Sequence, residues 1–250
     1  AEWGARVGQS DAVVNLAGEG IADGRWTRER LAQIRRSRIE STSAIAEAIA
    51  AADKKPAYVS GSAVGIYGMR KDDRVLDENG EHGTDVLVEI CEAWEKATEP
   101  ARRAGARVAL ARTGIVMGPD GGALAKMLPP FRAFAGGPLG DGNQWLSWIH
   151  IEDAVRGILF ALDRADFDGP FNLSAPKPVT MNDFARALGR ALHRPSVIRV
   201  PAVALKVALG EGLAETLLSG QRAVPALLER AGFTFRFEDV GVALRDLVGG

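Results

Sequence analysis

Serine, tyrosine, arginine and histidine side chains lie near the ends of apolar runs, where they could act on a bound molecule. They are Ser60, Ser62, Tyr67, Arg112 and His150. The serine hydroxyl groups could polarise a substrate oxygen by hydrogen bonding, and Tyr67 or His150 could transfer a proton. Arg112 could bind an anionic group. The candidate catalytic residues are therefore Ser62, Tyr67 and His150.

Each of these side chains also has a structural explanation. The two serines could cap backbone amides at the end of a strand, and Tyr67 could be a packed aromatic residue of a loop. His150 could form a hydrogen bond that links a strand end to a loop. Arg112 could form an internal salt bridge. The sequence leaves both explanations open for each residue.

The elements that must position these residues follow a regular pattern. Strands are predicted over 11–15, 56–60, 107–111 and 171–174, and helices over 26–52, 84–104, 123–134 and 152–164, the third interrupted at Pro129 and Pro130. From about Pro176 the sequence predicts a small helical region with one strand-like piece, over 233–237. Alternating strands and helices predict an α/β fold with a parallel sheet, right-handed crossovers and helices on both faces. Arg112 follows the third strand, and such sheets bind ligands at the carboxyl ends of their strands.

Three glycine-rich segments do not fit the turn that holds the phosphates of a dinucleotide, which needs a strand before it and a helix after it. Segment 18–24 has one residue too many between its glycines, and segment 61–68 runs into the polar segment 69–74. Segment 136–142 precedes a strand-like run. We expect ordinary turn glycines at all three places, and no dinucleotide phosphate turn in this chain.

The composition excludes several classes of protein. The 250 residues carry a net charge of −1, which gives no general attraction to nucleic acid or to a membrane. The sequence contains no run of about 18 apolar residues, the length that spanning a bilayer requires. The single cysteine, Cys91, cannot form an internal disulfide and indicates a reducing, cytoplasmic location. No His, Cys, Asp and Glu residues have the spacing of metal ligands, so no metal is expected.

A local basic run could be a solvated helix face or could contact an anionic substrate. It comprises Arg25, Arg28, Arg30, Arg35, Arg36 and Arg38. The run is too local, and too poor in interleaved aromatic residues, for a nucleic-acid surface.

Four segments resemble motifs of the short-chain dehydrogenase/reductases: NLAG (15–18), YVSGSAVGIYG (58–68), RTGIVMGP (112–119) and WIHIED (148–153). A closer resemblance is to their atypical, epimerase-like subgroup, which includes the bacterial YfcH-type proteins. It rests on NLAGEGI (15–21), RWT (25–27), SR (37–38), GGAL (121–124), GGPLG (136–140) and QW (144–145). Four further segments resemble the C-terminal, DUF1731-like module of that subgroup: NLSAP (172–176), HRP (193–195), SGQ (219–221) and GFTF (232–235).

The resemblance implies a fold and a cofactor. It implies a Rossmann-type doubly wound parallel sheet, N-terminally truncated, over 1–170, and a small, mainly helical module on the substrate side over 171–250. The cofactor would be NADP or NAD. The residues expected to bind it are Asn15, Leu16, Ala17, Gly18, Ser60, Arg112, Thr113 and Gly114.

The sequence departs from the family pattern in two ways. The family begins with a strand, a GxxGxxG turn and two further strands, whereas this chain begins just before the fourth strand. We therefore expect cofactor binding from the complete protein, and weak or no binding by the 250 residues alone. The usual Tyr-x-x-x-Lys pair is absent from its expected helix, where 87–94 reads LVEICEAW. Tyr67 and Lys71 have the spacing but lie in a loop, and the atypical subgroup itself lacks the pair.

Two functions follow from the resemblance. The first is an NAD(P)-dependent epimerase/dehydratase-like oxidoreductase of the atypical short-chain dehydrogenase/reductase type, which would need a proton donor other than the usual tyrosine. The alternative is a catalytically silent NADP-binding regulatory or scaffold protein on the same fold. The expected partner is a small molecule, anionic or a sugar nucleotide by analogy, with a homodimer as a further candidate. Nucleic acid and membrane are not expected.

Overall fold

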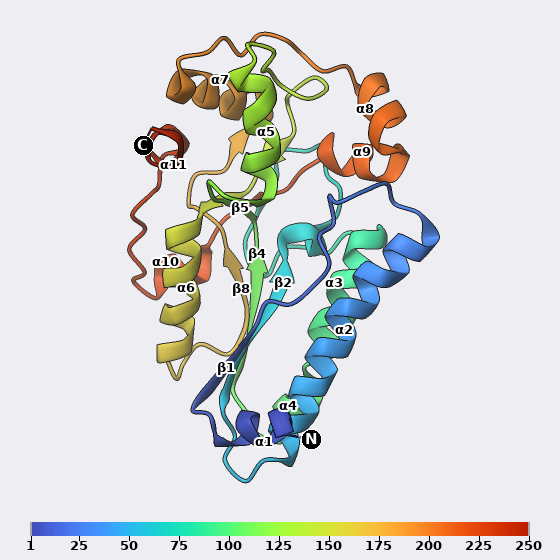
Figure 1. The fold of residues 1–250 in the computed structure, drawn as a ribbon. Coiled ribbons are helices and arrows are strands. Elements are labelled where there is room, and N and C mark those ends of the chain that lie inside the picture. Colours follow the sequence, from blue (N-terminus) through green and yellow to red (C-terminus); the bar gives the residue numbers. More distant parts are fainter. Residues whose placement is uncertain (1, 250) are drawn as a thin grey trace.

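Four parallel strands form the central sheet of the computed structural model, which describes residues 2–249 (Figure 1). In spatial order they are β1 (Ala12–Asn15), β2 (Ala57–Ala63), β4 (Val108–Thr113) and β8 (Gly169–Leu173). Asn15 is in register with Ser60, and Ser60 with Leu110. Because the strands run in one direction, their carboxyl ends meet at one edge of the sheet, toward the top of Figure 1. The predicted α/β fold with a parallel sheet is confirmed.

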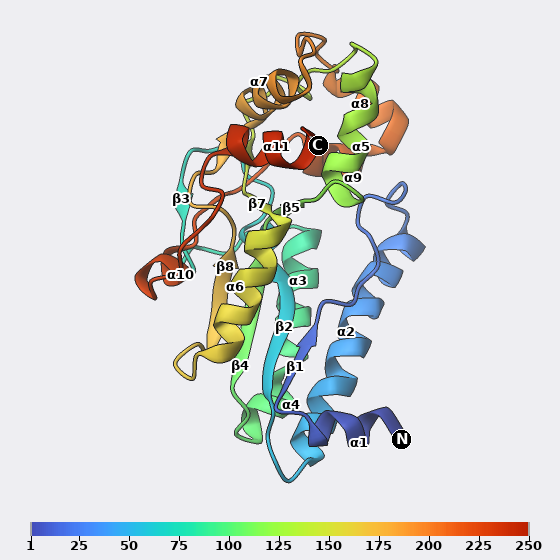
Figure 2. The same cartoon turned by 60° about the vertical axis from the view of Figure 1, so that its left-hand side comes forward.

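Helices cover both faces of the sheet (Figure 2). One side carries α1 (Glu2–Gln9), α2 (Arg28–Ala51), α3 (Val86–Lys96) and α4 (Glu99–Arg103), and the other carries α6 (Ile151–Asp163). Successive strand residues point to opposite faces. Tyr58 therefore packs with Ile49 of α2 and Ala101 of α4, while its neighbour Val59 packs with Ala161 of α6.

Helix α2 is 24 residues long and agrees with the helix predicted over 26–52. Its N-cap is Thr27, whose side-chain oxygen accepts a hydrogen bond from the backbone N–H of Arg30 at 3.1 Å. Ala46 and Ile49 are buried against the sheet. Among residues 2–249, no helix combines the length and the apolar composition that crossing a membrane requires.

Two helix predictions need correction, and both involve proline. The helix predicted over 84–104 is divided into α3, which Asp85 caps, and α4, which has Pro100 in its first turn. Proline fits a first turn, where its missing N–H would have no partner, and so it begins a new helix here. The interruption predicted at Pro129 and Pro130 is wrong, because α5 (Gly122–Arg132) continues through them. Both prolines are exposed, and water can satisfy carbonyl groups left without a partner on that side.

A second, mainly helical region lies beyond the carboxyl edge of the sheet (Figure 1). Besides α5, the helices of this region are α7 (Met181–Leu192), α8 (Ala202–Leu209), α9 (Glu211–Leu217) and α11 (Val240–Val248). Helix α10 (Ala226–Arg230) lies instead beside β8 of the sheet. Phe184 and Leu188 of α7 form a core with Leu128 of α5 and Leu244 of α11. Three short strand pairs connect the regions: β3 (Val75–Leu76) with β10 (Arg222–Ala223), β5 (Ile115–Met117) with β7 (Trp148–His150), and β6 (Trp145–Leu146) with β9 (Val179–Thr180). The division at residue 170 stays a prediction.

The strand-like piece expected at 233–237 is not a strand. Phe233 packs edge-on against Phe160 of α6, with ring centroids 5.3 Å apart. The backbone N–H of Phe237 donates to the buried carboxylate of Asp153 at 2.9 Å, and a second N–H of the same segment does so at 3.0 Å. A carboxylate on α6 thus supplies acceptors that a neighbouring strand would otherwise provide.

Candidate functional site

The segment Asn15-Leu-Ala-Gly18 forms a turn at the carboxyl end of β1. The buried side chain of Asn15 shapes it, since its Oδ1 accepts a hydrogen bond from the N–H of Ala17 at 3.1 Å. The Nδ2 of Asn15 donates to Oγ1 of Thr42 on α2, also at 3.1 Å. Leu16, Ala17 and Gly18 are exposed. A buried asparagine therefore holds an exposed stretch of backbone at the edge where a parallel sheet binds its ligands.

The loop that continues from this turn is tied to α2. Ser37 accepts a hydrogen bond from the N–H of Glu19 at 3.0 Å. Arg30 pairs with the Glu19 carboxylate at 3.0 Å and donates to the carbonyl of Gly20 at 2.8 Å. These contacts give the basic run a structural component, because Arg30 is used to hold the loop.

Trp94 of α3 packs closely against β2. A Cβ on Gly61 would lie 2.7 Å from the indole ring, so a larger residue would displace Trp94. The indole N–H donates to Oγ1 of Thr42 at 2.9 Å. Thr42 thus joins β1, through Asn15, to α3 at a buried point below the exposed turn.

A second group of polar residues is centred on Arg112, which is 4% exposed at the carboxyl end of β4. Its Nε and Nη2 donate to the two carboxylate oxygens of Glu95 at 2.9 and 3.1 Å. Ser62 donates to the same carboxylate at 2.6 Å. Burial opposes the charge of Arg112, but hydrogen bonds to Glu95 and the charge of Glu95 outweigh it and raise the guanidinium pKa. The salt bridge predicted as the structural alternative for Arg112 is present, and a part of Arg112 in cofactor binding stays a prediction.

Tyr67 belongs to the same group. It lies on η1 (Val64–Tyr67), is fully buried, and donates its hydroxyl to Oδ1 of Asn172 at 2.7 Å. Nη1 of Arg112 donates to the Tyr67 hydroxyl at 3.3 Å and to the carbonyl of Glu78 at 3.1 Å. Burial raises the pKa of Tyr67 despite the nearby cation. The hydroxyl that Tyr67 offers is thus occupied inside the protein, while Lys71 is exposed.

His150 has a different set of contacts from Ser62 and Tyr67. It is the N-cap of α6, where Nδ1 accepts a hydrogen bond from the N–H of Glu152 at 3.1 Å. Its Nε2 lies 3.2 Å from the Asp246 carboxylate of α11, and its ring stacks on Phe237 at 3.8 Å. Burial lowers the pKa of His150, and Asp246 only partly offsets this effect. The three residues predicted to be catalytic are therefore not brought together.

The remaining predicted cofactor residues are mostly structural in their contacts. Ser60 is fully buried, and its hydroxyl contacts the carbonyl of Gly61 at 3.3 Å. Thr113 is partly exposed and donates to the carbonyl of Ala111 at 3.1 Å. Gly114 allows β4 to approach the loop before β7, since a Cβ there would meet the carbonyl oxygen of Ser147. Their part in cofactor binding stays a prediction.

The sequence reasoning missed Glu95, Trp94 and Thr42. Glu95 could have been found, because it follows Cys91 by four residues and therefore continues the apolar stripe of α3. An acidic residue on a buried stripe predicts an internal cation. Thr42 gives no comparable signal, since a threonine within a polar helix is ordinary.

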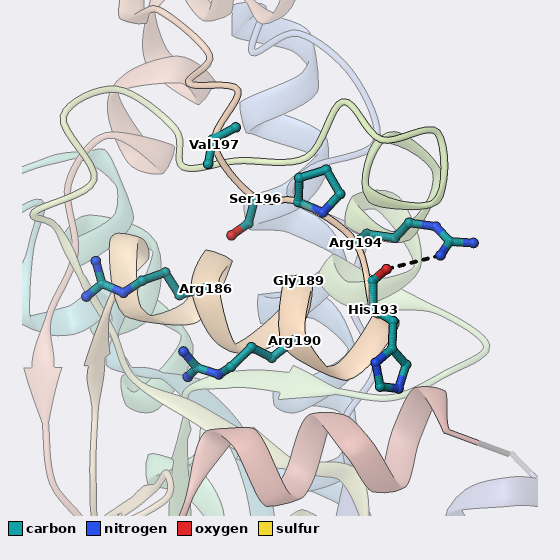
Figure 3. Close-up of a pocket in the computed structure, with 8 residues that line it drawn as sticks. Arg186, Gly189, Arg190, His193, Arg194, Ser196 and Val197 are labelled. Atoms are coloured by element: carbon teal, nitrogen blue, oxygen red, sulfur yellow. Dashed lines mark hydrogen bonds between the residues drawn. The ribbon is translucent and has the colours of Figure 1, made fainter.

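A cavity of about 490 Å³ lies elsewhere, at the C-terminal end of α7 (Figure 3). Arg186, Arg190 and Arg194 contribute to its lining. Their charges do not converge: Arg186 pairs with Asp183, and Figure 3 shows Arg194 directed away from Arg186. The Arg194 guanidinium lies 4.5 Å from the ring centre of Phe134. This cavity is separate from the strand ends that the sequence pointed to.

The fold and the strand-end residues define a protein of the Rossmann-like α/β class. The chain belongs to the NAD dependent epimerase/dehydratase family, whose model matches residues 1–174. Residues 200–247 match a second model, a domain of unknown function, DUF1731. Both matches agree with the resemblance read from the sequence.

Named relatives support the same assignment. Epimerase family protein Mb2239 of Mycobacterium bovis is 48% identical over 234 residues, which are 94% of this chain and 77% of the relative. The chloroplastic epimerase family protein SDR39U1 homolog of Arabidopsis thaliana is 45% identical over 250 residues, 99% of this chain and 71% of the relative. The crystal structure of human epimerase family protein SDR39U1 with NADPH superposes with a TM-score of 0.91 at 32% identity, covering 96% of this chain and 82% of that one.

Proposed function

We propose an NADPH-dependent oxidoreductase of the atypical short-chain dehydrogenase/reductase type as the function of this protein. The observation that carries the proposal is the turn Leu16–Gly18, exposed at the carboxyl end of β1 and held from below by Asn15. Support for the cofactor comes from the human relative, which was solved with NADPH. Bound NADPH would supply a hydride to a substrate carbon.

The residues present fit a nucleotide cofactor at this turn. Leu16, Ala17 and Gly18 offer exposed backbone, and Gly18 has no side chain to obstruct a bound group. Asn15 and Arg112 are buried and would act by fixing the strand ends rather than by contact. Among the eight residues predicted to bind the cofactor, we propose Leu16, Ala17 and Gly18 as those that touch it.

The proton that reduction requires has no clear donor, and this favours the second candidate function. Helix α3 presents Leu87, Cys91 and Trp94 where a tyrosine and lysine are usual, and burial raises the pKa of Cys91 to about 12. Ser62, Tyr67 and His150 stay predicted catalytic residues, although their polar atoms form hydrogen bonds inside the protein. A silent NADPH-binding regulatory or scaffold protein is therefore the alternative.

Binding and turnover by the full-length protein separate the two functions. Calorimetry with NADPH and NADH is expected to show binding, and oxidation of NADPH with sugar nucleotides and small carbonyl compounds tests turnover. Gly18→Val should weaken binding, because a side chain would enter the exposed turn beside Arg38, while Gly121→Ala, whose new Cβ meets no atom within 4 Å, should not. NADPH binding without turnover over a broad panel supports the silent protein, and absence of binding contradicts both.

The substrate, assembly and location are also proposals. A sugar nucleotide is suggested by fold neighbours such as the UDP-glucuronic acid 4-epimerase of Bacillus cereus, solved with UDP-glucuronic acid and NAD, which shares 14% identity. A homodimer and a cytoplasmic location stay predictions. One relative of this chain is named chloroplastic.

A further inference from the structure

Arg38 is a half-buried cation without a carboxylate partner among residues 2–249. Its neighbours differ in this respect, because Arg30 pairs with Glu19 and Arg112 with Glu95. A guanidinium carries five N–H donors. The structure gives Arg38 one acceptor, the carbonyl of Ile34, at 3.0 Å from Nη1.

The position of the Arg38 side chain is fixed from two directions. A Cβ on Gly18 would lie 3.1 Å from its Cζ, so the guanidinium rests directly against the exposed turn after β1. The same carbon lies over the ring of Trp94, 5.1 Å from the ring centre. Trp94 is itself held by Thr42 and fits against Gly61. The guanidinium is therefore preorganised at the ligand edge of the sheet.

The N–H groups of Arg38 that have no acceptor among residues 2–249 are accessible to solvent rather than buried. In the described part of the chain, Arg30 Nε is buried and has no hydrogen-bond acceptor. Within that part, no nitrogen of Arg38 is both buried and without an acceptor. The free N–H groups of Arg38 therefore reach accessible space. Burial lowers the pKa of the guanidinium, the charge of Arg30 acts in the same direction, and Cys91 and Glu19 act in the opposite direction. A partly desolvated cation with free donors gains more from an incoming anion than a hydrated surface arginine does.

We infer that Arg38 binds an oxyanion, a phosphate or a carboxylate, of the small molecule that occupies the carboxyl end of β1. This inference rests on the proposed function for the location of the ligand. The oxyanion has two possible sources, a phosphate of the cofactor or an acidic group of the substrate. Gly18 belongs to the same site, since a side chain there would separate the ligand from the guanidinium.

The test uses Arg38→Met and Arg38→Lys in the full-length protein, with Arg36→Met as the matched control. Arg36 is exposed on the same helix. The probes are NADPH, NADH, inorganic pyrophosphate and UDP-glucuronic acid, measured by calorimetry at two salt concentrations. Arg38→Met should weaken binding of the recognised probe by about 10- to 100-fold, with a smaller salt dependence, since it removes hydrogen bonds to a charged group. Arg38→Lys should recover part of the affinity.

Thermal unfolding provides a readout that a merely structural role would not give. Without ligand, the Tm of Arg38→Met should equal or exceed that of the wild type, because a partly desolvated charge without a carboxylate partner is removed. With ligand, the rise in Tm seen for the wild type and for Arg36→Met should be largely lost. A variant that unfolds earlier without ligand, and keeps its ligand-induced rise, overturns the inference.

The probes separate the sources and the two proposals. If Arg38→Met loses affinity for NADPH but not for NADH, Arg38 binds the extra phosphate of NADPH. If it loses affinity for both cofactors and for pyrophosphate, Arg38 binds a phosphate that the two cofactors share. A loss confined to UDP-glucuronic acid assigns the substrate. If the wild type binds neither cofactor, the proposed function fails, and the inference is then decided on pyrophosphate and UDP-glucuronic acid. Equal affinities of wild type and Arg38→Met for every probe that binds, or no binding of any probe, overturn the inference.

Discussion

The carboxylate of Glu95 receives two parallel hydrogen bonds from Arg112, at 2.9 and 3.1 Å, and links α3 to β4 inside the protein. The Arg112 side chain is 5% exposed and that of Glu95 is 13% exposed. Glu95→Ala would leave a buried guanidinium uncompensated, so we expect the free energy of unfolding to fall by about 3–5 kcal/mol in urea titrations. Glu99→Ala removes only the surface partner of Arg103 and should change stability little. Equal effects of the two substitutions would contradict the internal role of Glu95.

Tyr67→Phe tests whether the Tyr67 hydroxyl has a structural or a chemical role. Its removal leaves Oδ1 of Asn172 and one N–H of Arg112 without a buried partner. We expect a loss of about 1–3 kcal/mol in the free energy of unfolding, measured with urea. Any NADPH turnover by the folded variant should stay near the wild-type rate. A folded Tyr67→Phe variant that binds NADPH normally but has lost turnover would instead support the catalytic prediction.

Gly61→Ala should disturb the contact between β2 and α3. The new methyl group would lie 2.7 Å from the Trp94 ring and 3.3 Å from the carbonyl oxygen of Asn15, so one of them must move. We expect a loss of about 1–3 kcal/mol in the free energy of unfolding, and a change in tryptophan fluorescence. Gly121→Ala, which meets no atom within 4 Å, is the control. The smaller ring in Gly61→Ala/Trp94→Phe should recover part of the loss, and failure to recover any would place the strain elsewhere.

The buried imidazole of His150 predicts a dependence of stability on pH. Burial places its pKa in the folded protein below its ordinary value of about 6.5. Between these two pKa values the unfolded chain binds more protons at His150 than the folded protein does. The contribution of His150 to the free energy of unfolding is therefore fully present above about pH 6.5, and it falls as the pH decreases from there toward the pKa of the folded protein. His150→Asn keeps an N-cap acceptor but cannot titrate. Its urea stability should therefore change less between about pH 7.5 and 5 than that of the wild type.

The control for this prediction is His193→Asn. His193 is exposed and has a φ of 54°, a conformation that asparagine tolerates. This variant should keep the pH dependence of the wild type. The same slope in His150→Asn and in the wild type would show that other groups cause the dependence.

The sequence predicted the sheet and the long helix because their signals are local. Helix α2 was expected over 26–52 and begins at Arg28, after the N-cap Thr27. The error at 233–237 has a different origin, because the alternating phenylalanines there do resemble a strand. The backbone N–H groups of Arg236 and Phe237 are satisfied by Asp153, more than eighty residues earlier in the chain. No pattern within five residues can report such a distant acceptor.

The candidate site was predicted in position but not in its connections. Ser62, Tyr67 and Arg112 are all identified from the sequence, and the structure joins them: Glu95 links Ser62 to Arg112, and Arg112 donates directly to the Tyr67 hydroxyl, which in turn donates to Asn172. Glu95 and Asn172 belong to segments whose own patterns are fully explained by a helix and a strand. Side-chain partners across the sheet depend on packing between elements, and this information is absent from any single element.

Cys91 gives the molecule a built-in measure of its own local unfolding. It is the single cysteine of the chain, it is 4% exposed on α3, and burial raises its pKa to about 12. A thiol-specific reagent can react only after α3 separates from the sheet and the thiol ionises. The labelling rate of the native protein therefore reports how often α3, the helix that carries Trp94 and Glu95, separates from the sheet. A ligand that closes the edge of the sheet should slow this labelling, even if no reaction follows its binding.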